Sequence, residues 1–315
     1  MRRENTGAAG WKRAGVFAGM AVLAAVLQQY YLERGALPSE ILLPEPCFVA
    51  YAPMGTLADA RVVPIPTRAE DGFRLTAQQL RAAITPRTKA IILTSPNNPT
   101  GCIYDHESLT AVYAAAKEHP IFVLCDEVYR DLIYTDAFES FHQFSDLRSR
   151  IIEVQSFSKP YAMTGWRMGY VCGPKELISA MTKLHQYGIM SAPTTSQYAA
   201  IEAMENGDRD IENMREEYDG RRRFLVDGFR KLGLDCFEPR GAFYTFPCVK
   251  STGLSSEEFC ERLIVEEKVA VIPGTAFGPG GEGYVRACYA ASMRDLGEAL
   301  SRMGHFLENL KNSRV

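Results

Sequence analysis

The sequence contains no CxxC pair, no HExxH motif, no GxSxG motif and no run of five like charges. The first two absences argue against a zinc or dithiol redox site, and the third argues against a serine nucleophile elbow. Lysine and arginine number 35 against 38 acidic residues, and this near balance argues against a broadly basic nucleic-acid-binding protein. With 46% hydrophobic and 23% charged residues and no internal repeat, the composition is typical of a globular protein.

The length of 315 residues predicts about two domains. Eight cysteines are scattered along the chain, and several lie in apolar runs, such as Cys125 in IFVLCD. We therefore expect buried, reduced thiols in a cytoplasmic protein, although disulfides are the alternative.

The longest apolar run is residues 14–27, AGVFAGMAVLAAVL, which follows a basic N-terminal stretch. Fourteen residues are too few for a comfortable membrane span. A basic start followed by an apolar run is typical of a secretory signal, but no A-x-A cleavage site follows it. The alternatives at this point are a signal or anchor and a buried helix.

From about residue 39 onward, short β-branched runs alternate with helical patterns. Strands are predicted at 89–94, 121–125, 151–155 and 167–172, and helices at 107–119 and 174–187. Strands that are apolar throughout and separated by helices indicate an α/β fold with a mainly parallel sheet covered on both faces.

From about residue 207 the pattern changes to that of a smaller α+β domain. It predicts helices at 208–232, 255–267 and 293–311, with strands near 242–248, 269–272 and 284–289. We therefore divide the chain into a divergent or truncated N-terminal segment (1–38), a large domain (39–207) and a small C-terminal domain (208–315).

Polar residues follow three successive predicted strands. The segments are SPNNPTG at 95–101, DEVY at 126–129 and SFSK at 156–159. Asp126 lies 28 residues after Asn98 and 33 before Lys159, and each spacing is about one βαβ unit. Because ligands of open α/β sheets bind at the carboxyl ends of the strands, we expect the three segments to meet at one edge.

These side chains together describe a site for pyridoxal phosphate. Lys159 after an apolar strand can act as an amine nucleophile, and Asp126 is a fixed anion that would keep a pyridine nitrogen protonated. Arg167 can contact a phosphate in bidentate fashion, and Ser156 and Ser158 supply hydroxyl groups. Each residue alone also has an ordinary interpretation: a solvated lysine, a helix cap at Asp126, a tight SPNNPTG loop, or a surface ion pair of Arg167.

With YVRACYA at 284–290, the segments SPNNPTG, DEVY and SFSKPYAMTGWRMGY resemble the class I/II aminotransferases. This is the fold-type-I pyridoxal-phosphate family, and the similarity is to its aspartate and aromatic aminotransferase branch. The resemblance runs from about Pro44 to the C-terminus. It implies a three-layer large domain and a ping-pong transfer of an amino group between an L-amino acid and a 2-oxo acid. It also implies a cytoplasmic homodimer with no nucleic-acid or membrane partner.

The resemblance also implies a role for each matching residue. Lys159 would form the Schiff base with the cofactor and move the substrate proton, and Asp126 would pair with the pyridinium nitrogen. Tyr129 and Asn98 would hydrogen-bond the cofactor's phenolate oxygen, and Ser156, Ser158 and Arg167 would bind its phosphate. Phe48 in PEPCFVAY would stack on the ring, and Arg286 in YVRACYA would hold the substrate carboxylate. Phe48 and Tyr129 could instead be ordinary core residues.

The chain departs from the family pattern at its front, where the usual arm and phosphate-binding turn are not recognisable. The run at 14–27 could therefore be the remnant of a large-domain helix, which we prefer to a signal or anchor. Two alternatives to an aminotransferase remain. One is a β-eliminating lyase of the same fold, because the cofactor carries the chemistry in both. The other is a catalytically impaired fragment or a binding module.

Overall fold

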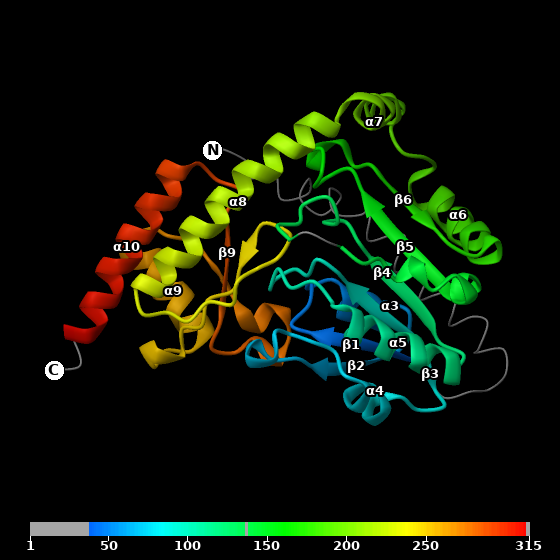
Figure 1. Ribbon diagram of the computed structural model, residues 1–315, viewed down its shortest axis with the longest axis horizontal. Helices are drawn as coiled ribbons and strands as arrows, with labels where there is room; N and C mark the ends of the chain where they lie inside the picture. The colour runs from blue at the N-terminus through cyan, green and yellow to red at the C-terminus, as the bar shows by residue number, and fades with distance from the viewer. Residues whose placement is uncertain (1–37, 136–137, 313–315) are drawn as a thin grey trace, which may run out of the picture.

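A computed structural model of the chain describes residues 38–135 and 138–312 (Figure 1). The segment at 14–27, with its alternative interpretations, lies outside these residues. No helix in the described part of the chain is both long and apolar enough to cross a membrane.

A six-stranded sheet with the order β2-β1-β3-β4-β5-β6 forms the centre of the larger part. Its first five strands run parallel, and β6 pairs antiparallel with β5. The sheet is therefore mainly parallel, as the sequence predicts. The strands are β1 (Glu40–Glu45), β2 (Arg61–Pro66), β3 (Thr88–Thr94), β4 (Phe122–Asp126), β5 (Ile151–Ser156) and β6 (Gly169–Cys172).

The reversal at β6 is a departure from the pattern of parallel strands separated by helices. The connection between β5 and β6 contains only a short 3-10 helix (Thr164–Trp166) and no α-helix of the kind that usually forms a parallel crossover. The strand begins at Gly169 and not at 167, because Arg167 adopts a left-handed conformation with φ of 55°.

Helices cover both faces of this sheet, which gives the expected three layers (Figure 1). Ile91 and Leu93 of β3 face a core shared with α4 and α5, while Ala90 and Ile92 face a core shared with α3 and α6. Alternate side chains are thus buried on opposite faces, which explains the uninterrupted apolar strands. The helices of the larger part are α3 (Tyr51–Leu57), α4 (Ala77–Ala83), α5 (His106–Glu118), α6 (Lys175–Ile189) and α7 (Thr194–Asn206).

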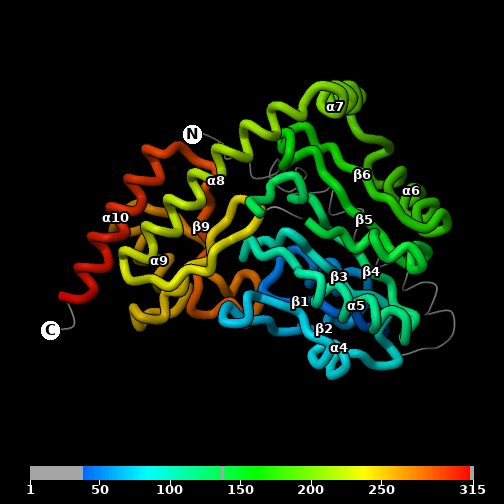
Figure 2. The backbone as a smooth tube through the Cα atoms, in the orientation of Figure 1, coloured from blue at the N-terminus to red at the C-terminus, as the bar shows by residue number. Residues whose placement is uncertain are grey.

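The C-terminal part has a separate hydrophobic core, which includes Leu225, Phe229, Phe259 and Phe306. Its elements are α8 (Asp208–Lys231), β7 (Tyr244–Thr245), α9 (Ser256–Glu267), β8 (Ile272–Pro273), β9 (Val285–Cys288) and α10 (Met293–Asn312). In Figure 2 this part, coloured yellow to red, lies to one side of the blue-to-green part. The division that we predict near residue 207 lies between α7 and α8, and it stays a prediction.

All eight cysteines are free, as expected for reduced thiols. The expectation that they are buried is wrong for three of them, of which Cys248 is half-buried. Cys172 and Cys288 lie in β6 and β9 and are exposed.

Candidate active site

The three polar segments lie at neighbouring strand ends, as their spacing predicts. Asp126 is the last residue of β4, and it pairs with Thr94 of β3 on one side and with Val154 of β5 on the other. The loop that contains Asn98 follows β3, and the turn that contains Lys159 follows β5. Parallel pairing therefore places all three segments at the carboxyl edge of one sheet.

The SPNNPTG loop is folded by its own first asparagine. The Asn97 side chain accepts hydrogen bonds from the backbone N–H and hydroxyl of Thr100, at 3.2 and 2.9 Å, and donates to the Pro46 carbonyl. Gly101 has a φ of 69°, and a Cβ there would lie 2.3 Å from Pro239. Only glycine therefore allows the loop to approach the C-terminal part so closely.

The second asparagine of the loop, Asn98, contacts the C-terminal part directly. Its Oδ1 accepts a 2.8 Å hydrogen bond from Arg286 in β9, a residue 188 positions away in sequence. The guanidinium of Arg286 also lies 4.4 Å from the Tyr244 ring centroid and 4.9 Å from that of Phe277. Its Nε is buried and has no hydrogen-bond partner within the described residues. A buried donor without a partner marks a place for an anionic ligand.

Lys159 is half-buried beside two aromatic rings. Its Nζ lies 5.3 Å from the ring centroid of Phe243 and 5.7 Å from that of Tyr129. Burial lowers the pKa of this amine, since removal from water disfavours the charged form. A lower pKa leaves more of the amine in the neutral form that attacks a carbonyl.

Neighbouring charges act on the same amine in both directions. Cys288, if ionised, and Asp126 raise the pKa of Lys159, while the guanidinium groups of Arg286 and Arg167 lower it. Asp126, Arg286 and Arg167 therefore all lie within electrostatic reach of Lys159.

Asp126 is buried and is the one anion of this group. Its Oδ2 accepts a 2.6 Å hydrogen bond from the hydroxyl of Tyr51, and its Oδ1 accepts one of 3.3 Å from the Val128 N–H. Burial raises the pKa of this carboxyl, and the hydrogen bonds from Tyr51 and Val128 and the charge of Lys159 oppose the increase. Sequence reasoning missed Tyr51, which has no signal of its own in a single sequence.

Tyr129 is buried, and its hydroxyl lies 3.0 Å from that of Tyr244. Its ring nevertheless lies beside the Lys159 amine, so its predicted contact with the cofactor stays a prediction. Phe48 is half-buried, and its ring packs edge-on against Tyr51 with centroids 5.7 Å apart. Its predicted stacking on the cofactor ring also stays a prediction. Sequence reasoning missed Tyr244, which pairs with Cys288 of β9 and whose ring lies against the Arg286 guanidinium.

The predicted phosphate contacts surround the turn after β5. The Ser156 hydroxyl accepts a hydrogen bond from the Ser158 N–H at 3.1 Å, so both serines are held in one compact turn. Arg167 is half-buried and donates a 2.7 Å hydrogen bond to the Thr164 carbonyl, which orders the guanidinium near the turn. Their joint role on a phosphate stays a prediction.

These residues fit pyridoxal phosphate and an amino-acid substrate. Lys159, Arg167 and Arg286 carry positive charge against the single negative charge of Asp126, which complements a phosphate and a carboxylate. No cation lies within ion-pair distance of the buried Asp126 among the residues described, and a protonated pyridine nitrogen would supply one. The partnerless Nε of Arg286 would suit a substrate carboxylate.

The comparison with known families decides the identity of the fold. The family profile described as aminotransferase class I and II matches residues 17–303. The chain belongs to this family. It is a fold-type-I aminotransferase, an enzyme of a family whose members use pyridoxal phosphate, as the sequence motifs predict. The match begins at residue 17, within the apolar run at 14–27.

Similar proteins agree with this assignment. The chain is 47% identical over 268 residues to the putative aminotransferase YugH of Bacillus subtilis, covering 85% of this chain and 69% of that protein. It is 43% identical over 275 residues to the aspartate aminotransferase of Pyrococcus abyssi, covering 86% and 71%. The solved aromatic aminotransferase of Pyrococcus horikoshii superposes with a TM-score of 0.87 and 40% identity, covering 93% and 78% of the two chains.

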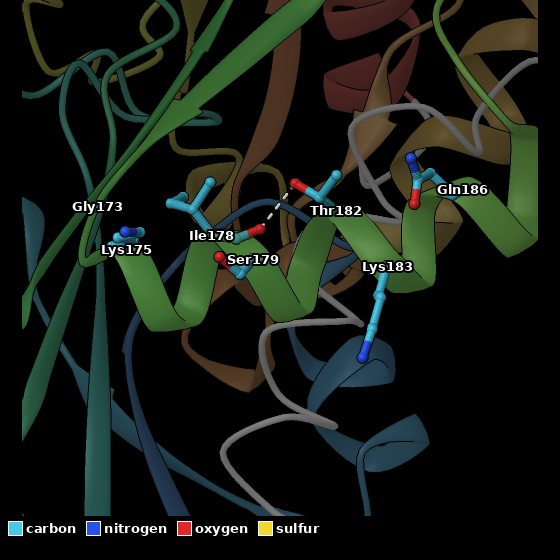
Figure 3. A pocket seen from close by; sticks show the side chains of 7 residues that line it. All are labelled: Gly173, Lys175, Ile178, Ser179, Thr182, Lys183 and Gln186. Atoms are coloured by element: carbon cyan, nitrogen blue, oxygen red, sulfur yellow. Dashed lines mark hydrogen bonds between the residues drawn. The ribbon is translucent and has the colours of Figure 1, made fainter.

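A shallow surface pocket of about 440 Å³ lies along α6, away from these residues (Figure 3). It contains none of the residues predicted for the site, and the Thr182 hydroxyl inside it bonds the Ile178 carbonyl of its own helix. We assign it no catalytic role. Its lining residues are Gly173, Lys175, Ile178, Ser179, Thr182, Lys183 and Gln186.

Next to Asp126, the aminotransferase buries a second carboxyl that the sequence did not single out. Glu127 is 3% exposed; its Oε1 accepts a 2.7 Å hydrogen bond from Ser140, and its Oε2 has no partner within the described residues. Burial and the charge of Glu153 raise the pKa of Glu127 to about 7, against the Ser140 hydrogen bond and the charge of Arg130. Glu153 itself pairs with Arg130 and with His142.

We expect Glu127→Gln to stabilise the enzyme at pH 8 and to stabilise it much less at pH 5. Because the folded pKa is raised from 4.5 to about 7, ionisation of Glu127 costs stability progressively as the pH rises through this window. The gain at pH 8 is at most about 3 kcal/mol. Urea unfolding at both pH values measures it.

Glu308→Gln, at an exposed position of α10, is the matched control and should change stability equally little at both pH values. An equal effect of Glu127→Gln at pH 5 and pH 8 would show that Glu127 ionises normally in the folded protein.

Proposed function

We propose that this aminotransferase moves the amino group of an L-amino acid to a 2-oxo acid, with Lys159 as its catalytic lysine. The observation that carries the proposal is the convergence of Lys159, Asp126 and Arg286 from three segments far apart in sequence. Their charges and burial suit an aldehyde cofactor, its ring nitrogen and a substrate carboxylate in that order.

Each residue has a defined task in this proposal. Pyridoxal phosphate, when bound, supplies an aldehyde carbon for the amine and a ring that withdraws electrons. The Lys159 amine holds that carbon and later carries a proton at Nζ, while Asp126 keeps the ring nitrogen protonated through its carboxylate. Asn98 and Tyr129 donate to the phenolate oxygen, and Phe48 packs on the ring.

The remaining residues bind the two anionic groups. Ser156, Ser158 and Arg167 hold the phosphate, and Arg286 holds the α-carboxylate of the substrate. Because Arg286 comes from the C-terminal part and already bonds Asn98, movement of that part toward the sheet would complete the site and exclude water.

The test is a half-reaction with purified protein and pyridoxal phosphate. We expect the absorption of the bound cofactor to decrease when an amino-acid donor is added alone and to return with a 2-oxo acid. A panel of acidic, aromatic and aliphatic donors would identify the substrate. Release of ammonia without a 2-oxo acid would favour a β-eliminating lyase, and lack of any cofactor binding would contradict the proposal.

We further propose that the enzyme forms a homodimer through α7. One face of this helix, at Ser196 and Ala200, is buried, and Ala200 packs beside Phe157 in the turn that carries Lys159. The rest of the helix exposes large apolar side chains at i, i+3 and i+6: Tyr198 (71%), Ile201 (52%) and Met204 (62%). Tyr187 of α6 and Met190, directly after it, are also exposed. Apolar patches of this kind mark protein–protein interfaces, and a second copy here would support the lysine turn.

We expect Met204→Asp to convert the dimer to a monomer, because a charge would be buried in the interface without a partner. Light scattering after size-exclusion chromatography measures the mass. Val265→Asp, at an exposed apolar position of α9, is the control and should leave the dimer intact. A Met204→Asp variant that keeps a dimer mass would place the interface elsewhere.

A further inference from the structure

Tyr51, the first residue of α3, lies fully buried between two polar strand ends. Its hydroxyl donates to Asp126 Oδ2 at 2.6 Å and accepts from Thr94 Oγ1 at 2.8 Å. The three groups thus form one continuous chain of hydrogen bonds in the interior of the protein.

The direction of this chain follows from the chemistry of its members. An ionised carboxylate only accepts hydrogen bonds, so Tyr51 must donate its single proton to Asp126. The Tyr51 oxygen can then accept a hydrogen bond from the Thr94 hydroxyl. Burial and the charge of Asp126 raise the pKa of Tyr51 far above its usual range, so this proton is retained at physiological pH. Each bond in such a chain polarises and strengthens the next.

The fold brings these groups together for a structural reason. Thr94 and Asp126 are register partners at the ends of the parallel strands β3 and β4, so their side chains leave the same face of the sheet. The core on that face contains Tyr51 and Met54 of α3, which covers the strand ends. The ring of Tyr51 is therefore held by packing in the position from which its hydroxyl bonds both groups.

We propose that Tyr51, supported by Thr94, is a positioning residue that keeps Asp126 ionised and directs its second oxygen toward the ring nitrogen of the cofactor. This inference rests on the proposed function, in which Asp126 holds that nitrogen. Oδ1, which has only a long bond of 3.3 Å from Val128, is the oxygen left for the contact. A charge-assisted hydrogen bond at Oδ2 would fix the rotation of the carboxylate that makes this contact.

The test measures cofactor affinity and not turnover. Apoenzyme is titrated with pyridoxal phosphate and with its 1-deaza analogue, which has carbon in place of the ring nitrogen. We expect Tyr51→Phe to weaken binding of pyridoxal phosphate by about 10-fold and to leave binding of the analogue nearly unchanged. Thr94→Val should have the same effect at a smaller magnitude. When Asp126 is already replaced with asparagine, Tyr51→Phe should change the affinities for pyridoxal phosphate and for the analogue by the same factor.

Tyr289→Phe is the matched control, because it removes a buried hydroxyl that donates to the Ala242 carbonyl instead. It should not change the ratio of the two affinities. Equal losses for both ligands in Tyr51→Phe would overturn the inference and leave Tyr51 a packing residue. Failure of the unmodified apoenzyme to bind pyridoxal phosphate would instead contradict the proposed function.

Discussion

Replacement of Lys159 with alanine is expected to lower transamination by about 10³-fold or more, because one side chain performs two tasks. Its amine holds the cofactor covalently, and it carries the proton that leaves the substrate carbon. The structure supports both tasks, since Lys159 is half-buried, has a lowered pKa and lies within electrostatic reach of Asp126 and Arg286. Steady-state rates with the best donor of the panel measure the loss.

A chemical experiment tests the same residue independently of rate. Borohydride treatment of the protein saturated with pyridoxal phosphate should fix the cofactor on the peptide that contains Lys159, as mass spectrometry would show. Lys183→Ala, at an exposed position of α6, should keep both the rate and the label. A label on another lysine, or full activity of Lys159→Ala, would remove Lys159 from the mechanism.

The three central strands of the large-domain sheet, β3, β4 and β5, were predictable because they are buried on both faces. The runs at 89–94, 121–125 and 151–155 correspond closely to β3, β4 and β5, and apolar residues at every position are the signature of such strands. The β strands of the C-terminal part are harder to locate. β7 and β8 contain two residues each, so they are too short for a period-two pattern, and only β9 follows its predicted range closely.

The candidate site was predictable where its residues follow strands or occur in a dense motif. Asn98, Asp126 and Lys159 were located by that rule, and the Arg286–Asn98 hydrogen bond joins two of the motifs. Tyr51 could not be found in this way. Its role depends on the contact between its hydroxyl and a residue 75 positions away, and nothing local in the sequence records that contact.

The hydrogen-bond partners of the buried carboxyl groups also could not be predicted from the sequence. Glu127 follows Asp126 directly, and both belong to the same DEVY motif. Asp126 accepts a hydrogen bond from the hydroxyl of Tyr51, whereas one oxygen of Glu127 has no hydrogen-bond partner within the described residues. The donors available to each of these adjacent carboxyl groups depend on the packing of α3 and of the loop around Ser140, and both come from other parts of the chain.

Replacement of Arg286 with leucine is expected to lower kcat/KM for amino-acid donors by about 100-fold or more. The guanidinium is held between the rings of Tyr244 and Phe277 and bonded to Asn98, yet its buried Nε has no partner among the described residues. A substrate carboxylate would satisfy this donor, and leucine offers neither the charge nor the hydrogen bonds. Affinity for pyridoxal phosphate, measured by titration of the apoenzyme, should change by less than about threefold, because Arg286 is assigned to the substrate.

Two further variants distinguish binding of the substrate carboxylate by Arg286 from a purely structural role of this residue. Arg286→Lys keeps the charge but cannot bind a carboxylate in bidentate fashion, so it should recover only part of the lost kcat/KM. Arg294→Leu, which removes an exposed arginine at the start of α10, should leave both constants unchanged. If Arg286→Leu weakened cofactor binding as strongly as substrate binding, its bond to Asn98 would be its main contribution. Arg286 would then organise the cofactor site, and the substrate carboxylate would need another cation.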